Sequence, residues 1–485
     1  MNIRRFVQSL LLLILFSSVA IPARAESRGQ IQWSEPIRFS SADRTSSPVV
    51  IADAAGNVHV MWSQYTLEPP LATGGDTLYY QRWDGQNWTA PADVLTSPRV
   101  NEAAERPELA VTPDGYLHAL WNTGGAHGTL YHSRAPACCA ETAGAWSDPR
   151  LVDVGSLGET IALVADHQGR LYAAYASAET GGIVVLRSDN SGLTWPTRSE
   201  FADPALARSE YSLYPRLAVD ALDRVHVVWS VLPWPGHRVV YARSDDGGIQ
   251  WRVRIIDQAD PERYPSEGYG PILIDVECRG EQEVHLIWDG APTVERNHVW
   301  SLDGGDTWSE PALLFPEIKG VGRAGWNDMA FDSVGTLHSV TLMQPWHAQW
   351  VDGMWSASTP LSTPPSWAEN MRLAVNLGNQ LHVVWNRVYE GEPNSVWYAF
   401  GQIEISSQLP QALPDPRVSH ANAPLATASL GTMAAPSSLV ARSERLPSGY
   451  SSEDSTRDTF RALGWGVFPA FLIAISVILL KAIRR

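Results

Sequence analysis

Several loop segments of this sequence combine aromatic, acidic and arginine side chains, which are residue types that suit a sugar or an anionic group. The richest segment, 259–270, contains Glu262, Arg263, Tyr264, Glu267 and Tyr269. Guanidinium groups bind carboxylates through two parallel hydrogen bonds, which adds geometric specificity to the charge. We expect a ligand to contact the following residues: Arg106, Arg216, Arg263, Tyr211, Tyr214, Trp326, Asp328 and Trp367. The same composition is also typical of an ordinary solvated rim of loops.

The elements that position these loops follow from a phrase that recurs seven times. Each copy has an apolar strand, a tight turn of the form Asp-x-x-Gly, and a second strand that ends in an aromatic residue. In the first copy, 48–62, the turn is formed by Asp53 and Gly56, and the second strand contains His59. The residues at the position of His59 are His59, His118, Tyr172, His226, His285, His338 and His382. We call these residues the markers of the seven copies. Successive markers are 44 to 59 residues apart, which is the length of four short strands with their loops.

Four-stranded units repeated around an axis predict an all-β chain with a β-propeller fold. The seventh unit stops after its third strand, 396–400, and the chain begins with an unpaired fourth strand, 33–37. We expect strand 33–37 to complete the seventh sheet and so to close the ring. The sequence therefore predicts a seven-bladed β-propeller over residues 31–401.

The repeated histidines invite a metal-binding interpretation, but their symmetry argues against it. Six of the seven units place a histidine at the same strand position. The repeat spreads these side chains around the ring, whereas a metal needs three or four ligands at about 2 Å. We therefore expect histidines that pack inside the sheets, and neither a metal ion nor another cofactor.

The three cysteines are Cys138, Cys139 and Cys278. Adjacent cysteines rarely bridge each other, and the spacing matches no zinc pattern. One of the adjacent pair could bond Cys278, or all three could be small buried residues. The sequence leaves their pairing open.

Composition and the chain ends predict the location of the ring. The net charge of -16 argues against a nucleic-acid partner, whose phosphates need a lysine and arginine surface.

Residues 1–25 have the basic, apolar and small-residue regions of a signal peptide. Residues 462–480 contain no charge and are long enough for a transmembrane helix, and the basic tail 481–485 should stay cytoplasmic. Residues 402–461 are rich in Ser, Pro and Ala and predict a flexible stalk. We expect a single-pass protein of the cell membrane with its ring on the extracytoplasmic side. A tail of this shape could also be a sorting signal that is later removed.

The turns between third and fourth strands carry a motif that identifies a family. Residues 301–308 read Ser-Leu-Asp-Gly-Gly-Asp-Thr-Trp, residues 244–251 match except at Gln250, and residues 188–195 match except at Asn190. This motif resembles the Asp-box of the sialidase-like (BNR-repeat) propeller superfamily, and the resemblance covers residues 31–401. It implies a carbohydrate-related propeller, with the six-bladed sialidase type as the alternative to seven blades. It also implies that the boxes lie away from the active site, so that Asp246 and Asp303 are structural.

The resemblance also implies which side chains a catalytic sialidase would need. Three arginines hold the substrate carboxylate, a tyrosine paired with a glutamate attacks the sugar, and an aspartate supplies the proton. The catalytic candidates are Tyr264, Tyr269, Glu262 and Glu267. The aromatic-Arg-Ile-Pro phrase that usually carries the family's first arginine does not occur here, and seven units are counted where catalytic members have six blades. We therefore expect the loop-rich face to bind a glycan, peptide or protein partner, with an exo-sialidase-like glycoside hydrolase as the alternative.

Overall fold

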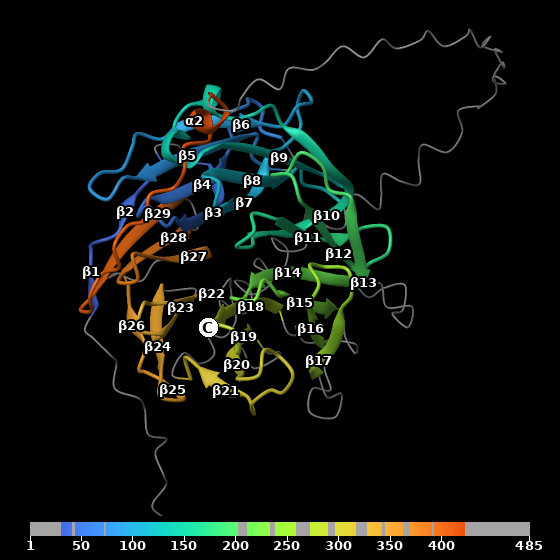
Figure 1. The fold of residues 1–485 in the computed structure, drawn as a ribbon. Coiled ribbons are helices and arrows are strands. Elements are labelled where there is room, and N and C mark those ends of the chain that lie inside the picture. The colour runs from blue at the N-terminus through green and yellow to red at the C-terminus, as the bar shows by residue number, and fades with distance from the viewer. Residues whose placement is uncertain are drawn as a thin grey trace, which may run out of the picture. The chain divides into compact units, whose positions relative to one another are not determined.

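The computed structural model describes residues 31–40, 44–71, 74–201, 211–232, 238–258, 272–289, 296–316, 327–341, 345–361, 368–389 and 392–421. The predicted signal peptide 1–25, transmembrane helix 462–480 and tail 481–485 lie outside these ranges. Within them, no helix combines the length and the apolar character that crossing a bilayer requires. The described chain is built from small antiparallel sheets set around a central axis (Figure 1).

Three of the sheets are simple four-stranded units in which each strand pairs with the next. The first contains β3(Thr45–Ala52), β4(Val58–Gln64), β5(Thr77–Trp83) and β6(Ala92–Thr96). The second contains β14(Tyr211–Val219), β15(Val225–Leu232), β16(Arg238–Ser244) and β17(Arg252–Gln258). The third contains β18(Ile272–Arg279), β19(Glu283–Asp289), β20(Arg296–Ser301) and β21(Ala312–Leu314). Each unit has the strand–turn–strand order that the repeated phrase predicts.

A seven-stranded sheet joins two further units through one long strand, β10(Arg150–Ala165). Its first half pairs with β9, with Leu151 opposite Tyr131, and its second half pairs with β11, with Leu163 opposite Ala173. β10 therefore serves as the outer strand of one unit and the inner strand of the next. The other strands of this sheet are β7(Glu105–Val111), β8(Tyr116–Asn122), β9(Gly128–Pro136), β11(Leu171–Ser177), β12(Ile183–Ser188) and β13(Thr197–Phe201).

The last two sheets complete the ring, and one of them joins its two ends. One contains β22(Asp328–Phe331), β23(Leu337–Thr341), β24(Trp346–Val351), β25(Met354–Trp355) and β26(Thr359–Pro360). The other contains β27(Ala368–Asn376), β28(Gln380–Tyr389), β29(Glu392–Ile403), β1(Ile31–Trp33) and β2(Ile37–Arg38). In it Trp33 lies opposite Gly401 and Ile37 opposite Tyr398, and the Ser34 amide donates to the Phe400 carbonyl at 2.7 Å. The predicted closure by the leading strand is confirmed.

The apolar core is divided among the interfaces between neighbouring sheets. The tryptophans that end the second strands, Trp62, Trp121, Trp288 and Trp385, are among the largest fully buried side chains. Trp121, for example, packs with Leu78 and Tyr80 of the preceding sheet. Similarly, Trp62 packs with Val384 and Tyr398, which connects the first sheet to the last. Aromatic residues at this repeat position therefore hold adjacent sheets together.

The marker histidines lie inside the sheets, as predicted. All six are fully buried. The ring nitrogens of His59 lie 2.7 Å from the Tyr80 hydroxyl and 3.2 Å from the Asp53 carboxylate of its own turn. In three units the partner is a second histidine, as in His118–His132, where the nitrogens are 3.0 Å apart. The described residues contain no group of His, Cys, Asp and Glu side chains that could hold a metal ion.

The turn at 301–308 has the contacts that its motif implies. The Asp303 carboxylate accepts hydrogen bonds from the amides of Asp306 and Thr307 at 3.0 and 2.8 Å. Gly304 and Gly305 have φ values of 72° and 93°, a region that glycine enters without steric cost. Trp308 packs edge-on against Tyr241 of the preceding sheet, with ring centroids 5.0 Å apart. This turn therefore stabilises the interface between two sheets.

The predicted stalk 402–461 needs a correction at its start. β29 runs to Ile403, and beyond it the amides of Gln408 and Gln411 donate to the carbonyls of Leu377 and Ala54. Leu413 packs against the core between the first two units, and a short helix, α2(Pro416–Ala421), follows. Composition alone missed these contacts because main-chain amides of any residue type can pair with exposed turn carbonyls. Residues 422–461 lie outside the described chain.

The cysteine pairing also differs from the expectation. Cys138 and Cys139 are paired with each other at the end of a short 3-10 helix, although adjacent cysteines rarely bridge. The guanidinium of Arg417 lies 3.1 Å from the Cys139 sulfur. Cys278 lies half-buried in β18 and is not in a disulfide. The tight turn at 137–139 brings the two neighbouring sulfurs together, which residue spacing does not reveal.

The buried histidines make stability depend on pH. Burial lowers the pKa of seven of them, to about 3 for His118 and His382. The other five are His132, His226, His285, His298 and His347. Unfolded histidines have a pKa of about 6.5, so below that pH the unfolded chain binds protons that the folded chain does not. Burial raises the pKa of three carboxyls, Asp275, Glu277 and Asp289, which acts in the opposite direction but involves fewer groups.

We therefore expect the melting temperature to fall as the pH is lowered from about 6.5 to about 4. The measurement is thermal unfolding in a series of buffers at constant ionic strength. His382→Gln should make this dependence shallower, because it removes one group whose folded pKa is low. A melting temperature that stays constant or rises over this range would contradict the account.

Candidate functional site at the mouth of the ring

The site begins with an irregularity shared by the inner strands. The pairing register shifts between Ser46 and Val49 in β3, and equivalent shifts occur in β7, β14 and β27. Four residues in these shifts have φ near +50°: Ser47, Arg106, Tyr214 and Asn370. A β-bulge bends its strand and redirects a side chain, and positive φ is uncommon for residues other than glycine. The bulges thus place polar side chains at equivalent points around one end of the ring.

The residues two positions after the bulge residues belong to a layer of mostly charged side chains. The layer lies ten residues before the marker of each repeat, and five of its seven positions are charged: Glu108, Arg216, Asp275, Asp328 and Arg372. The remaining two positions are Val49 and Ala162. All seven line one cavity. Because the innermost strands of the sheets surround the axis (Figure 1), this layer brings charge to the centre of the ring.

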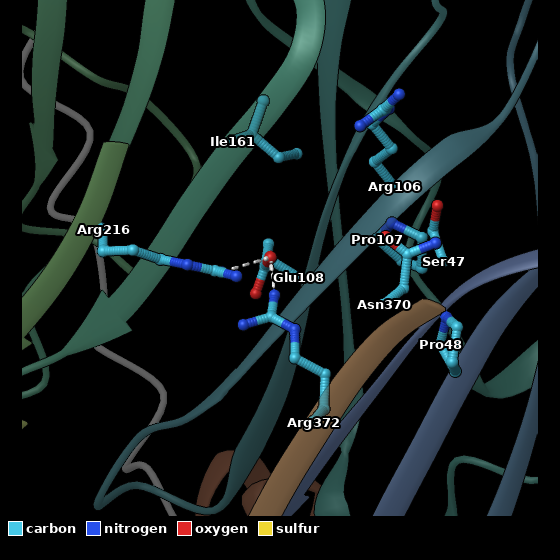
Figure 2. Close-up of a pocket in the computed structure, with 9 residues that line it drawn as sticks. All are labelled: Ser47, Pro48, Arg106, Pro107, Glu108, Ile161, Arg216, Asn370 and Arg372. Atoms are coloured by element: carbon cyan, nitrogen blue, oxygen red, sulfur yellow. Dashed lines mark hydrogen bonds and ion pairs between the residues drawn. The ribbon is translucent and has the colours of Figure 1, made fainter. Parts of the chain in front are cut away.

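Glu108 joins two arginines from distant parts of the chain. Its Oε1 accepts from Arg216 Nη1 at 3.3 Å and also from Arg372 Nη2 (Figure 2). The three side chains are only 8%, 13% and 14% exposed for Arg216, Glu108 and Arg372. Burial and the neighbouring Arg372 lower the pKa of Arg216, whereas the carboxylates around Arg372 outweigh its burial and raise its pKa. Both arginines remain charged in either case, because a guanidinium does not deprotonate in proteins. Glu108 therefore links three sheets across the axis.

Asp275 and Asp328 form a second group in the same layer. Their carboxyls are hydrogen bonded to each other, and burial together with the charge of Asp328 raises the pKa of Asp275 well above its ordinary value. Each carboxyl also accepts a main-chain amide, from Met329 to Asp275 at 2.9 Å and from Leu373 to Asp328 at 2.7 Å. A second carboxylate this close disfavours ionisation of Asp275, so the protonated form of Asp275 is stabilised. Such a pair can donate a proton or hydrogen bond to a hydroxyl.

A small pocket lies at the mouth of the ring, beside the charged layer. Its volume is about 30 Å³, which is enough for at least one water molecule. Its lining residues are Ser47, Pro48, Arg106, Pro107, Glu108, Ile161, Arg216, Asn370 and Arg372 (Figure 2). Three arginines against one glutamate favour an anionic or strongly polar group. A larger cavity of about 330 Å³ extends along the inner strands.

The structure brings some of the predicted residues together. Arg106 and Arg216 line the mouth pocket, Tyr214 occupies a bulge, and Asp328 belongs to the charged layer. Tyr211 lies at the start of β14, where only the backbone is described. The others lie outside the described residues: Glu262, Arg263, Tyr264, Glu267, Tyr269, Trp326 and Trp367.

Sequence reasoning missed Glu108, Asp275 and Arg372. These charges stand in otherwise apolar inner strands, so they did not appear in a search of the loops. A signal was available, because each lies ten residues before the marker of its repeat. Aligning the seven copies by their markers places all of the charged positions in one column.

Replacing Glu108 tests the axial ion pairs. In Glu108→Gln the two buried guanidiniums lose the charge they share, so we expect a loss of about 3–5 kcal/mol in the free energy of unfolding. The control is Glu68→Gln, because Glu68 pairs at 3.7 Å with Arg44 and the two side chains are 81% and 56% exposed. That change should cost about 1 kcal/mol or less. Urea titration measures both, and equal losses would contradict the assignment of Glu108.

No protein-family model matches the sequence, and no curated protein matches it significantly. Solved structures do resemble it. An ulvan lyase, a polysaccharide lyase, has a TM-score of 0.51 and 12% identity over 75% of this chain and 95% of its own. A protein of unknown function from Dyadobacter fermentans has a TM-score of 0.47 and 12% identity over 77% and 99%. The NanB sialidase of Streptococcus pneumoniae has a TM-score of 0.43 and 12% identity over 76% and 69%.

At these identities the likeness concerns the fold alone. The likeness to the ulvan lyase and the sheets set around one axis support the predicted architecture: the chain has a β-propeller fold.

Proposed function

We propose that this propeller binds a glycan at the bulged mouth of its ring, and that an acidic or strongly polar group of the glycan enters the arginine-lined pocket. The observation that carries the proposal is the set of bulges, which concentrates Ser47, Arg106, Tyr214 and Asn370 around one opening. Structural similarity lends support, since the ulvan lyase of similar fold has also been solved bound to -[GlcA(1-4)Rha3S]-, an acidic saccharide. A peptide or protein with an acidic side chain has the same chemistry at this pocket.

Binding without hydrolysis is favoured by the state of the arginines. A sialidase needs arginines that converge on the substrate carboxylate, but here Arg216 and Arg372 both bind Glu108 of the protein itself. One observation favours the alternative, an exo-sialidase-like glycoside hydrolase: burial and the charge of Asp328 raise the pKa of Asp275, which suits a carboxyl that protonates a leaving group.

The proposal includes a ring of seven blades. It is supported by the double use of β10, which divides the seven-stranded sheet into two four-stranded units that share this strand. It is also supported by the apolar clusters, each of which packs between two successive units, including the last and the first. The turns at 188–195, 244–251 and 301–308 would then be Asp-boxes on the face away from the bulges.

We further propose that the ring is extracytoplasmic and held to the cell membrane by residues 462–480. The support is the sequence: an uncharged span of nineteen residues followed by Lys481, Arg484 and Arg485.

Glycan binding is tested with the full-length protein in a non-ionic detergent on an array of neutral and acidic glycans. We expect retention on acidic glycans that falls at least tenfold in Arg106→Ala. Arg150→Ala is the matched control, because Arg150 is exposed on the outer strand β10. Retention on no glycan would remove the proposed function. Turnover of a fluorogenic sialoside or of a small panel of glycosides by the same protein would favour the alternative.

Membrane attachment is tested by fractionating cells that express the full chain or a version ending at residue 461. The full chain should sediment with membranes and be digested by protease added to intact cells or spheroplasts. The shortened chain should be released. A full chain that stays in the soluble fraction would contradict the assignment of residues 462–480.

A further inference from the structure

The cavity of about 330 Å³ inside the ring is separate from the mouth pocket in its chemistry. Its lining runs from the charged layer to Ala52, Phe331 and Val375, the residues that directly precede the turns of three units. It therefore extends from the centre of the ring toward the end opposite the bulges. Small side chains such as Ala162, Ala330 and Ala374 leave the space open.

Glu277 places an acidic side chain on the wall of this cavity. It follows Asp275 by two positions in β18, so both side chains project to the same side of the strand, into the cavity. Val276 between them points into the apolar core. The equivalent position is Ile51 in β3, Ala330 in β22 and Ala374 in β27. Glu277 is thus a charged residue at a level of the channel where other strands place apolar residues.

No basic side chain compensates the charge of Glu277 among the residues that the structure describes. No hydrogen bond or ion pair joins its carboxyl to a described residue, whereas Glu108 in the layer above holds two arginines. The groups that act on Glu277 are burial first and then the like charges of Asp275 and Asp328, and all of them raise its pKa. Arg216 of β14 and Arg372 of β27 face this region too, but they are engaged by Glu108.

Glu277 is a half-buried carboxyl with no counterion among the described residues, and it lines a cavity of about 330 Å³. This is the chemistry of a cation site that lacks its cation. A metal ion would need three or four ligands in close geometry, and the described residues contain no such group. A guanidinium or ammonium group on a flexible chain needs one carboxylate and a channel wide enough for its apolar stem. The volume of about 330 Å³, bordered by alanines and valines, provides such a channel.

We propose that the inner cavity is a second binding site, in which Glu277 pairs with a guanidinium or ammonium group that enters from the turn-bearing end of the ring. The group belongs to an arginine or lysine side chain of a polypeptide or to a small organic cation. Glu277 lines this cavity and not the glycan pocket, although Glu108, Arg216 and Arg372 border both. Asp275 and Asp328 add negative charge at the inner end of the cavity.

The site makes a specific prediction about protons. Burial raises the pKa of Glu277 and so favours its protonated form. A cation pairs with the ionised carboxylate, so binding should release a proton and strengthen as the pH rises. Glu108, Asp275, Asp328, Arg216 and Arg372 are the other charged groups that line the cavity. An amide at position 277 would bind no proton and should abolish the release.

Calorimetry on the full-length protein in detergent tests the proposal, with butylguanidine as the small cation and butylurea as its neutral counterpart. We expect saturable binding of butylguanidine, at least tenfold weaker in Glu277→Gln, and none of butylurea. The heat should change with the ionisation enthalpy of the buffer for the unaltered protein only. Glu281→Gln is the matched control, since Glu281 is exposed in the turn that follows β18.

A second arm uses the peptide Gly-Gly-Arg-Gly amide. Tighter binding of the peptide than of butylguanidine would assign the site to a polypeptide side chain, and weaker binding to a small cation.

Equal binding by the unaltered protein and Glu277→Gln would overturn the proposal, as would equal binding of butylguanidine and butylurea. Glu277→Gln should melt no lower than the unaltered protein, because a neutral amide avoids the cost that burial imposes on a charged carboxylate. Loss of glycan retention with intact cation binding would refute the glycan function alone.

Discussion

The ring depends on the main-chain pairing between its two ends. β1 and β2 are short, yet they supply the outer edge of the sheet formed by β27, β28 and β29. Without them β29 would present an unpaired edge, and the apolar cluster between the last and first units would be held only by side chains. The chain therefore connects residues more than 360 positions apart through hydrogen bonds such as Ser34 to Phe400. Every other interface in the ring joins units that are neighbours in sequence.

A closed ring forces its inner strands to share a narrow axis, and this explains the charged layer. Side chains at one repeat position meet at this axis from all sides. A charged side chain on one strand therefore needs an oppositely charged side chain, or a proton, from another strand. Glu108 pairs with Arg216 and Arg372, and the charge of Asp328 helps to raise the pKa of Asp275. Glu277 lies two residues further along β18 than Asp275, and no described basic group pairs with its carboxyl. The same geometric constraint thus produces structural ion pairs in one layer and a candidate binding group in the next.

The two ends of the ring differ for a local reason. At one end, tight turns are held by carboxylates such as Asp303 and by glycines with positive φ. At the other end, the inner strands carry bulges, and the bulge residues Ser47, Arg106 and Asn370 line the mouth pocket. The first end is built for stability between sheets, and the second presents variable side chains on a rigid frame. The segment after β29 adds to the first end, where it pairs with the turns of the last and first units.

The sequence by itself determined the repeat, and with it much of the architecture. The apolar strands, the Asp turns and the buried histidines and tryptophans are local patterns, because each depends on residues that are close in the chain. The closing strand was also readable, since an unpaired fourth strand and a missing one complement each other. The candidate site was predictable only in part: Arg106, Arg216, Tyr214 and Asp328 were found, but Glu108, Asp275, Glu277 and Arg372 were not.

What only the tertiary structure decided is which charges meet. Glu108 and Arg372 are 264 positions apart, and no local rule pairs them. The bulges, the partner of Cys138 and the contacts of residues 404–415 were also decided by three-dimensional packing. The physical reason is that periodicity specifies the shape of each sheet, whereas ion pairing at the axis depends on closing the ring and removing these side chains from water.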